Sequence, residues 1–225
     1  MELLVYDTAE EVAIGAASRI ADLVGDATER FTLGLAGGST PRATYQSLIG
    51  RVVGWDKVWA YLSDERWVPA DSERSNGKMA QETLFDRVEG HFIRPRYGDH
   101  LTPADSAAYY EAKVRSIHHG DRPDLILLGL GEDGHTASLF PESRALEERN
   151  RWIVANQVTD TGEQRITATY PMLWSAHRLV VITVGTNKAA ALRDAFDGAN
   201  PAGRLGDGDA LVEWHVDRAA ASLYS

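Results

Sequence analysis

The sequence contains no cysteine. This absence excludes disulfide bonds, zinc sites built from thiolates and cysteine nucleophiles, although it does not determine the cellular compartment. No apolar run approaches the length that crosses a membrane, and residues 1–7 include no basic stretch of the kind that begins a secretion signal. We therefore expect a cytoplasmic protein that binds no membrane.

Positive charge is also scarce. Lys and Arg number 23 against 33 Asp and Glu, which gives a formal net charge of −10. This balance argues against a general surface for nucleic acid or anionic lipid, so any anionic ligand must be held by a local cluster of cations. The length of 225 residues, with 44% hydrophobic and 25% charged residues, suits one α/β domain over residues 1–225.

The chain is organised around residues 124–141, where a buried strand, a glycine turn and a histidine follow one another. Residues 125–128 read Leu-Ile-Leu-Leu, an apolar run typical of a strand covered on both faces of a parallel sheet. Because ligands of open α/β sheets bind beyond the carboxyl ends of the strands, we expect Asp133 and His135 to lie at that edge. Residues 136–140 are predicted to form a short helix, whose first turn would leave backbone N–H groups free at the site.

The glycines of this turn also have the spacing Gly-x-Gly-x-x-Gly of a dinucleotide-binding loop. They stand at positions 129, 131 and 134. In that interpretation a pyrophosphate would lie against Glu132 and Asp133, and Asn156 would stand where a ribose-binding acid is expected. The match to a dinucleotide site is therefore weak.

A second loop favours phosphate. It reads Gly37-Gly38-Ser39-Thr40-Pro41, between a predicted strand over residues 31–36 and a predicted helix over residues 42–49. Its glycines allow close backbone approach, its hydroxyls can donate hydrogen bonds, and its proline suits the first turn of a helix. Alone, the loop could equally be an ordinary strand-to-helix turn. It lacks the lysine of a nucleoside-triphosphate P-loop, which argues against an ATPase.

Charged residues follow two more predicted strands, over residues 58–62 and 179–184. Asp64 and Arg66 come soon after the first, and Lys188 follows the second at the start of a helix that ends near residue 196. The ends of parallel strands meet at one edge of a sheet, which would bring these charges together. A lysine opposes the dipole at a helix start; a bound anion would remove that mismatch, and a solvated lysine explains it equally well.

The other predicted elements form the scaffold. Thr8 and Glu11 have the spacing of a capping box, which predicts a helix as far as residue 24. We expect strands at residues 3–6, 152–158, 165–171 and 211–216, and helices at 78–88, 104–117 and 172–176 and near the C-terminus. We also expect an irregular connection at 91–101 and a mobile loop at 197–209. We interpret His118 and His119 as cations at a helix end rather than metal ligands, and expect neither a metal nor a cofactor.

Five segments resemble, in order, the sequence pattern of the 6-phosphogluconolactonase family. They are Leu35-Ala-Gly-Gly-Ser-Thr-Pro41, Ser63-Asp-Glu-Arg-Trp-Val-Pro69 with Ser75-Asn76, Leu128-Gly-Leu-Gly-Glu-Asp-Gly-His-Thr-Ala-Ser-Leu-Phe-Pro141, Arg165-Ile-Thr-Ala-Thr-Tyr-Pro171 and Gly185-Thr-Asn-Lys188. The resemblance implies a three-layer, Rossmann-like α/β/α fold with a mostly parallel sheet, shared with glucosamine-6-phosphate deaminases and ribose-5-phosphate isomerases. It also implies hydrolysis of 6-phospho-D-glucono-1,5-lactone to 6-phosphogluconate in the pentose phosphate pathway, by a monomer or homodimer.

The residues fit that chemistry. A neutral imidazole can accept a proton from water near pH 7 and return it to the leaving ring oxygen, so we predict His135 as the general base, as the resemblance also implies. Asp133 is predicted to orient His135 or to stabilise its protonated form. The resemblance further implies an anion site for the phosphate or the developing oxyanion, and which cation serves which end stays open. That site comprises Arg66, Arg165 and Lys188, beside Gly37, Gly38, Ser39, Thr40 and Asp64. Of these residues, Arg165 is predicted to be catalytic, together with His135 and Asp133, and the others to bind the substrate.

Two other functions compete with the lactonase. Glucosamine-6-phosphate deaminases share the fold, but they carry Asn-Glu-Pro shortly after the Gly-His pair, whereas this chain has no carboxylate between His135 and Glu142. They also tend to have an aromatic residue in the place of Arg66. A sugar-phosphate sensor on the same scaffold would normally be joined to a DNA-binding module, for which these 225 residues leave no room.

Overall fold

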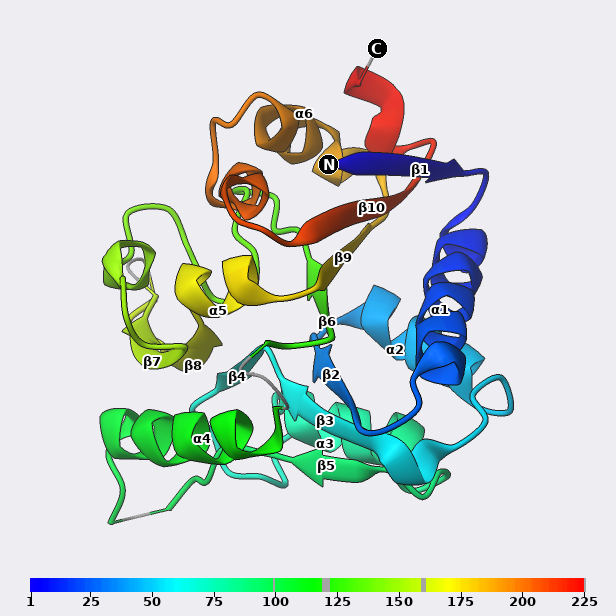
Figure 1. The fold of residues 1–225 in the computed structure, drawn as a ribbon. Coiled ribbons are helices and arrows are strands. Elements are labelled where there is room, and N and C mark those ends of the chain that lie inside the picture. Colours follow the sequence, from blue (N-terminus) through cyan, green and yellow to red (C-terminus); the bar gives the residue numbers. More distant parts are fainter. Residues whose placement is uncertain (99, 119–121, 159–160, 225) are drawn as a thin grey trace.

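A parallel sheet of seven strands forms the centre of the molecule, which is described by a computed structural model over residues 1–98, 100–118, 122–158 and 161–224. In spatial order the strands are β1 (Glu2–Tyr6), β10 (Leu211–Asp217), β9 (Arg178–Thr183), β6 (Leu125–Gly129), β2 (Phe31–Leu35), β3 (Val58–Leu62) and β5 (His91–Ile93). Every pairing in this sheet is parallel. In Figure 1 the strands of this sheet follow one another from β1 near the top to β5 near the bottom.

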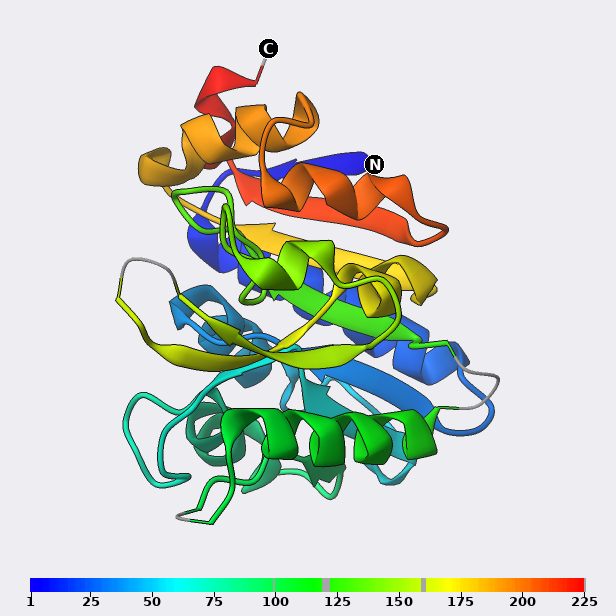
Figure 2. The ribbon, with the colours of Figure 1, turned by 90° about the vertical axis from the view of Figure 1, so that its left-hand side faces the viewer.

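Helices cover both faces of this sheet. In Figure 1, α1 (Ala9–Asp26) and α2 (Ser39–Leu48) lie on one side, and α5 (Tyr170–Ser175) lies on the other. The remaining α-helices of the described residues are α3 (Asn76–Ala80), which continues as a π-helical turn over Gln81–Phe85, α4 (Pro103–Ile117) and α6 (Ala189–Phe196). Figure 2 shows α4 and α5 in front of the sheet and α1 behind it. The predicted three-layer α/β/α fold is therefore confirmed.

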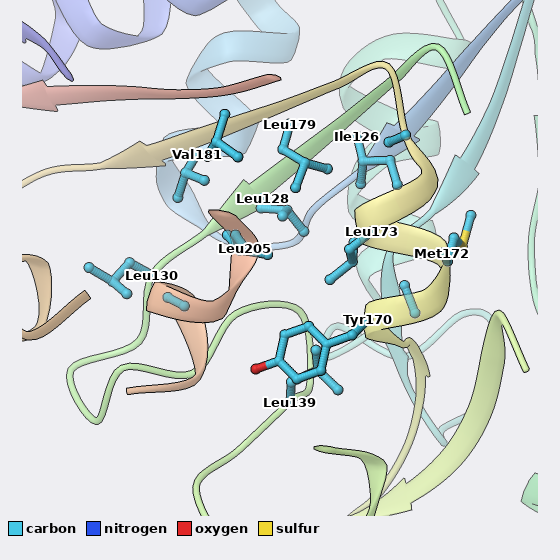
Figure 3. Packing of buried hydrophobic residues seen from close by; sticks show 14 of the residues in the cluster. Ile126, Leu128, Leu130, Leu139, Tyr170, Met172, Leu173, Leu179, Val181 and Leu205 are labelled. Atoms are coloured by element: carbon cyan, nitrogen blue, oxygen red, sulfur yellow. The ribbon is translucent and has the colours of Figure 1, made fainter. Parts of the chain in front are cut away.

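The alternation of side chains along β6 divides the core into two clusters. Leu125 and Leu127 pack with α1, α2 and α3, whereas Ile126 and Leu128 pack with α4, α5 and α6. Successive side chains of a strand point to opposite faces, so a strand buried on both faces must be apolar throughout. Figure 3 shows the second cluster, which includes Leu128 and residues of α5.

Three further strands form a small antiparallel sheet that the sequence did not predict as a unit. Its order is β4 (Asp64–Arg66), β8 (Gln164–Ala168) and β7 (Ile153–Gln157). No strand is predicted at residues 63–69 from the sequence, but the backbone of β4 pairs with β8, and Asp64 and Glu65 are buried. Ser63 forms the junction between the sheets, because its N–H donates to Leu35 and its carbonyl accepts from the N–H of Ala168, both at 2.7 Å.

The prediction of a helix over residues 136–140 is wrong. Ala137 has a positive φ of 48°, and Thr136 forms an isolated bridge with Leu139. The backbone N–H of Ser138 donates to the hydroxyl of Thr167 on β8 at 3.0 Å. Hydrogen bonds to the small sheet therefore replace those that a helix would make within the segment.

Residues 197–209 are also more ordered than the sequence suggests. Pro201–Asp207 is a 3₁₀ helix, and the side chain of Leu205 is fully buried. Tyr170 donates its hydroxyl to the carbonyl of Pro201 at 2.7 Å, and Trp174 donates its indole N–H to that of Arg204 at 2.7 Å. The composition of residues 197–209, rich in Gly and Asp, gives no indication of these hydrogen bonds, because the donor side chains lie on α5 and not within the segment.

Other boundaries differ more modestly from the predictions. Helix α2 begins at Ser39 rather than at residue 42, the helix predicted over 78–88 ends at Phe85, and the connection at 91–101 contains β5. The last strand, β10, lies between β1 and β9. The capping contact at α1 is confirmed, since Thr8 accepts from the N–H of Glu11 at 3.2 Å.

His118 is the C-cap of α4, and its side chain is buried. Its ring lies edge-on to Tyr61 and Trp152, at centroid distances of 5.4 and 5.3 Å. His119 lies outside the described residues. Within the described residues, no group of three or more His, Cys, Asp or Glu side chains is placed to hold a metal ion, and no helix is long and apolar enough to cross a membrane.

A buried charged cluster joins α1 to β10. Glu213 accepts a hydrogen bond from Arg19 at 2.8 Å and is paired with Arg178. Beside it, His215 Nδ1 lies 3.0 Å from the hydroxyl of Tyr6. Burial lowers the pKa of His215, and the neighbouring carboxylate of Glu213 only partly opposes this effect.

The lowered pKa of His215 predicts a loss of stability on acidification. Below about pH 6.5, the usual pKa of histidine, the unfolded chain takes up a proton that the buried ring resists, so the free energy of unfolding falls until the pH reaches the folded-state pKa. We expect His215→Gln to show a shallower fall between pH 7 and pH 5 in urea titrations. His177→Gln, at an exposed position, should keep the wild-type slope, and equal slopes in all three proteins would contradict the prediction.

Candidate active site

Segments that follow four neighbouring strands line one cavity at the carboxyl edge of the sheet. The strands are β9, β6, β2 and β3, which stand side by side in the sheet order. The polar and glycine residues of the lining are Gly37, Gly38, Asp64, Arg66, Asn76, Gly129, Gly131, His135, Arg165 and Lys188. The structure thus brings together most of the site residues that the sequence predicts.

His135 and Asp133 are in direct contact. Nδ1 of His135 lies 2.5 Å from Oδ1 of Asp133, which also accepts the backbone N–H of His135 at 3.2 Å. Partial burial disfavours the Asp133 carboxylate, but the interactions with His135 outweigh burial and lower its pKa. Because a carboxylate can only accept, this contact places the proton of a neutral His135 on Nδ1 and leaves Nε2 as the basic nitrogen.

Gly131 makes room for this pair. A Cβ atom at position 131 would lie 2.1 Å from Nδ1 of His135 and 2.5 Å from Oδ1 of Asp133, so no other residue fits without displacing them. The imidazole also packs on Phe140, with ring centroids 4.2 Å apart. The contacts with Asp133 and Phe140 together restrict the position of the imidazole.

Two arginines meet on the small sheet. Arg66 of β4 and Arg165 of β8 are directly opposite each other in the antiparallel register. Like charges at such positions repel. Burial lowers the pKa of both guanidinium groups, and for Arg66 the charge of Arg165 adds to the effect. The pair therefore forms a cationic site whose repulsion a bound anion would relieve.

Asp64 faces the segment that follows His135. Its Oδ2 accepts the hydroxyl of Ser138 at 2.6 Å and lies 3.8 Å from Nη1 of Arg165. Asn156 donates to the carbonyl of Ser138 at 2.8 Å. These contacts explain why residues 136–140 take an irregular path, and they link the histidine turn to the arginine strands.

Residues 37–41, the loop whose sequence favours phosphate and which we call the phosphate-type loop, are only partly exposed to the cavity. Gly37 and Gly38 line it, whereas Ser39 and Thr40 lie in the first turn of α2 and are not among the lining residues. Gly38 is the N-cap of α2, with a positive φ of 113° that favours glycine. Any role of this loop in anion binding therefore depends on its backbone and on the helix start.

Lys188 lines the opposite end of the row of strands, after β9. It is the last residue of a short 3₁₀ turn and the N-cap of α6. The neighbouring Asn187 donates to Glu132 Oε1 at 2.7 Å, which ties this turn to the one after β6. The lysine thus belongs to the same edge as His135.

Comparisons with known proteins agree with this arrangement. Residues 7–214 match the model of the family described as glucosamine-6-phosphate isomerases/6-phosphogluconolactonase. The chain belongs to this family. A 6-phosphogluconolactonase of Nostoc sp. is 38% identical over 178 residues, which cover 74% of this chain and 72% of the relative. One of Rhizobium meliloti is 34% identical over 194 residues, 83% of this chain and 82% of the relative.

Solved structures of the glucosamine-6-phosphate isomerase/6-phosphogluconolactonase family share the fold. The 6-phosphogluconolactonase of Trypanosoma brucei superposes with a TM-score of 0.89 at 25% identity, over 100% of this chain and 98% of that chain. A monomeric glucosamine-6-phosphate deaminase gives 0.86 at 23% identity, over 99% and 100% of the two chains, which shows the fold alone. The family and the enzyme class predicted from the sequence are confirmed by these relatives.

The sequence did not identify two buried residues of this family member's site. Asn76 accepts from Arg66 Nη1 at 2.7 Å and donates to the carbonyl of Asp64 at 3.0 Å. Glu65 accepts from the N–H groups of Arg66, Asn76 and Gly77 and from the hydroxyl of Ser75, and burial nevertheless raises its pKa. The quoted Ser75-Asn76 pair was the available signal, but local sequence indicated only a helix start.

Gly37→Ala tests the fit between the phosphate-type loop and Asn76. A Cβ at position 37 would lie 2.0 Å from Oδ1 of Asn76, so we expect the amide to move and Arg66 to lose one of its two acceptors. Overpacking of this kind costs about 1–3 kcal/mol, which urea denaturation can measure. Gly25→Ala is the control, since a Cβ there meets nothing within 4 Å and should leave stability equal or higher. Wild-type stability in Gly37→Ala would contradict the prediction.

Proposed function

We propose that this chain acts as a single domain, residues 1–225, that hydrolyses 6-phospho-D-glucono-1,5-lactone to 6-phosphogluconate, a reaction of the pentose phosphate pathway. The observation that carries the proposal is that the His135–Asp133 pair and the Arg66–Arg165 pair line or adjoin one cavity. A base and a cationic site are the two features that a phosphorylated lactone requires. The names of the relatives support this substrate.

In the proposed mechanism, Nε2 of His135 takes a proton from water as the oxygen attacks the lactone carbonyl. A C–O bond forms, the carbonyl oxygen takes up the negative charge, and the tetrahedral intermediate then collapses with cleavage of the ring C–O bond. The protonated imidazole returns its proton to the leaving ring oxygen. Asp133 keeps the Nδ1 proton in place and stabilises the imidazolium.

The cations would bind the phosphate and the developing oxyanion. In a protein of net charge −10, Arg66, Arg165 and Lys188 supply local positive charge around the cavity. Guanidinium groups can grip phosphate through two N–H bonds, which favours the arginines for that end. The backbone of Gly37 and Gly38, at the start of α2, supports the same anion.

A deaminase function has less support from the cavity. Asp64 is the only carboxylate among the described residues that line it, and the segment after His135 brings Phe140 rather than an acid to the imidazole. The assay of function should therefore follow acid release from freshly generated lactone above the spontaneous background, with glucosamine 6-phosphate deamination in parallel. We expect lactone hydrolysis alone. Deamination alone would replace the proposal with a deaminase function. If the protein shows neither activity, a sugar-phosphate sensor becomes the favoured function.

His135→Ala tests the general base. Removal of a positioned base costs about 10²–10⁴-fold in rate, so we expect kcat to fall on that scale while binding of 6-phosphogluconate changes little. His177→Ala, at an exposed position, is the matched histidine control and should retain wild-type turnover. Near-normal kcat in His135→Ala would remove this residue from the mechanism.

Neutralising the cations tests the anion site. We expect Arg66→Gln, Arg165→Gln and Lys188→Gln each to weaken 6-phosphogluconate binding about tenfold, the scale of one lost charge-assisted hydrogen bond. Isothermal titration calorimetry can measure the three affinities. Arg149→Gln removes an arginine from an exposed pair with Glu147 and should bind normally. Unchanged affinity in all three cavity variants would refute the site.

A further inference from the structure

Three charged side chains form a continuous row that leads to the cavity from outside. Arg74, between β4 and α3, is paired with Glu163, and Glu163 Oε2 lies 2.5 Å from Nη2 of Arg165. The exposed fraction falls along the row, from 62% for the Arg74 side chain to 17% for Glu163 and 13% for Arg165. Of the three, only Arg165 lines the cavity.

Glu163 holds one edge of the Arg165 guanidinium and leaves another available. Nη1 of Arg165 is 3.8 Å from Asp64, beyond hydrogen-bond distance, and the buried Nε of Arg165 has no hydrogen-bond partner within the described residues. A guanidinium has five N–H donors, so this arrangement keeps donors for an anion in the cavity. Glu163 itself does not line the cavity and so does not compete there with the ligand.

Arg165 needs such a partner because it stands opposite Arg66. Repulsion between the two guanidinium groups, together with the rotamer freedom of a long side chain, would otherwise move Arg165 away from the cavity. The backbone of Glu163 is fixed at the start of β8, where its carbonyl accepts the N–H of Val158 at 2.9 Å. The carboxylate thus acts from a defined position.

Arg74 connects the two arginines of the cavity. Its carbonyl accepts from Arg66 Nη1 at 3.0 Å, while its side chain pairs with Glu163. One residue outside the cavity therefore contacts Arg66 directly and Arg165 through Glu163.

We propose that Glu163 is a positioning residue that holds Arg165 ready for the phosphorylated substrate, and that Arg74 in turn orients Glu163. This inference rests on the proposed function, because it assigns Arg165 to substrate binding. Glu163 acts before and during binding and takes no part in the proton transfers at His135. Its loss should therefore raise KM more than it lowers kcat.

The first variant is Glu163→Gln, which keeps the shape of the side chain and removes its charge. We expect KM to rise about tenfold, the scale of a lost charge-assisted contact to a buried group, with kcat within about threefold of wild type. Glu147→Gln, which breaks an exposed pair with Arg149, is the matched control and should leave KM unchanged. Glu163→Asp, which keeps the charge, should recover part of the wild-type KM.

Arg74→Gln tests the outer member of the row. Because Arg74 is largely exposed, we expect a smaller rise in KM, about two- to threefold. If Arg74 acts through Glu163, the double variant Arg74→Gln/Glu163→Gln should have the KM of Glu163→Gln alone rather than the product of both effects. Multiplying effects would overturn the role assigned to Arg74.

Two results would overturn the role of Glu163. One is an unchanged KM in Glu163→Gln while Arg165→Gln raises KM. The other is an equal loss in KM and kcat together with a lower unfolding midpoint, which would assign Glu163 to the stability of the β7–β8 hairpin. If the wild type hydrolyses no lactone, the proposed function fails, yet calorimetry with 6-phosphogluconate and inorganic phosphate still compares Glu163→Gln with the wild type. Equal affinities there, or no binding by the wild type, would also overturn the inference.

Discussion

The parallel alignment of β9, β6, β2 and β3 is the constraint on which the site depends. β6 is paired on both sides, with Leu125 aligned to Leu33 of β2 and to Arg178 of β9. The side chains of Leu125–Leu128 are buried on both faces, and the parallel pairing with β2 and β9 fixes the register of the strand from both edges. The segments that follow these strands must therefore emerge at the same edge of the sheet. The turn with His135, the loop with Gly37 and Gly38, and Lys188 meet there.

The concentration of cations at that edge carries an electrostatic cost. Arg66 and Arg165 face each other in partly buried positions, and burial lowers the pKa of both, because removing a guanidinium from water disfavours its charged form. Asp64 and Glu163 offset part of this cost, and Asn76 supplies a neutral acceptor. What the carboxylates leave uncompensated would be available to an anion such as the phosphate group of the proposed substrate.

The sequence predicted the central sheet and its residues well because these depend on local patterns. The apolar runs at β6 and β9 and the glycine and charge signals after the strands are visible within a few residues. It failed where distant segments decide the backbone. β4 is a strand because β8 pairs with it, the segment after His135 is irregular because Thr167 and Asp64 bind Ser138, and Pro201–Asp207 is helical because α5 supplies its partners.

The glycines of the site illustrate the same limit more sharply. From the sequence, Gly37 is interpreted as a place where a ligand can approach the backbone. In the structure, the atoms that occupy the space of its missing Cβ belong to Asn76. At Gly131 they belong to His135 and Asp133. In both places glycine accommodates a side chain of the protein, and that side chain fixes the orientation of the group that would act on the substrate. Gly131 therefore leaves room for the contact through which Asp133 holds the proton of a neutral His135 on Nδ1.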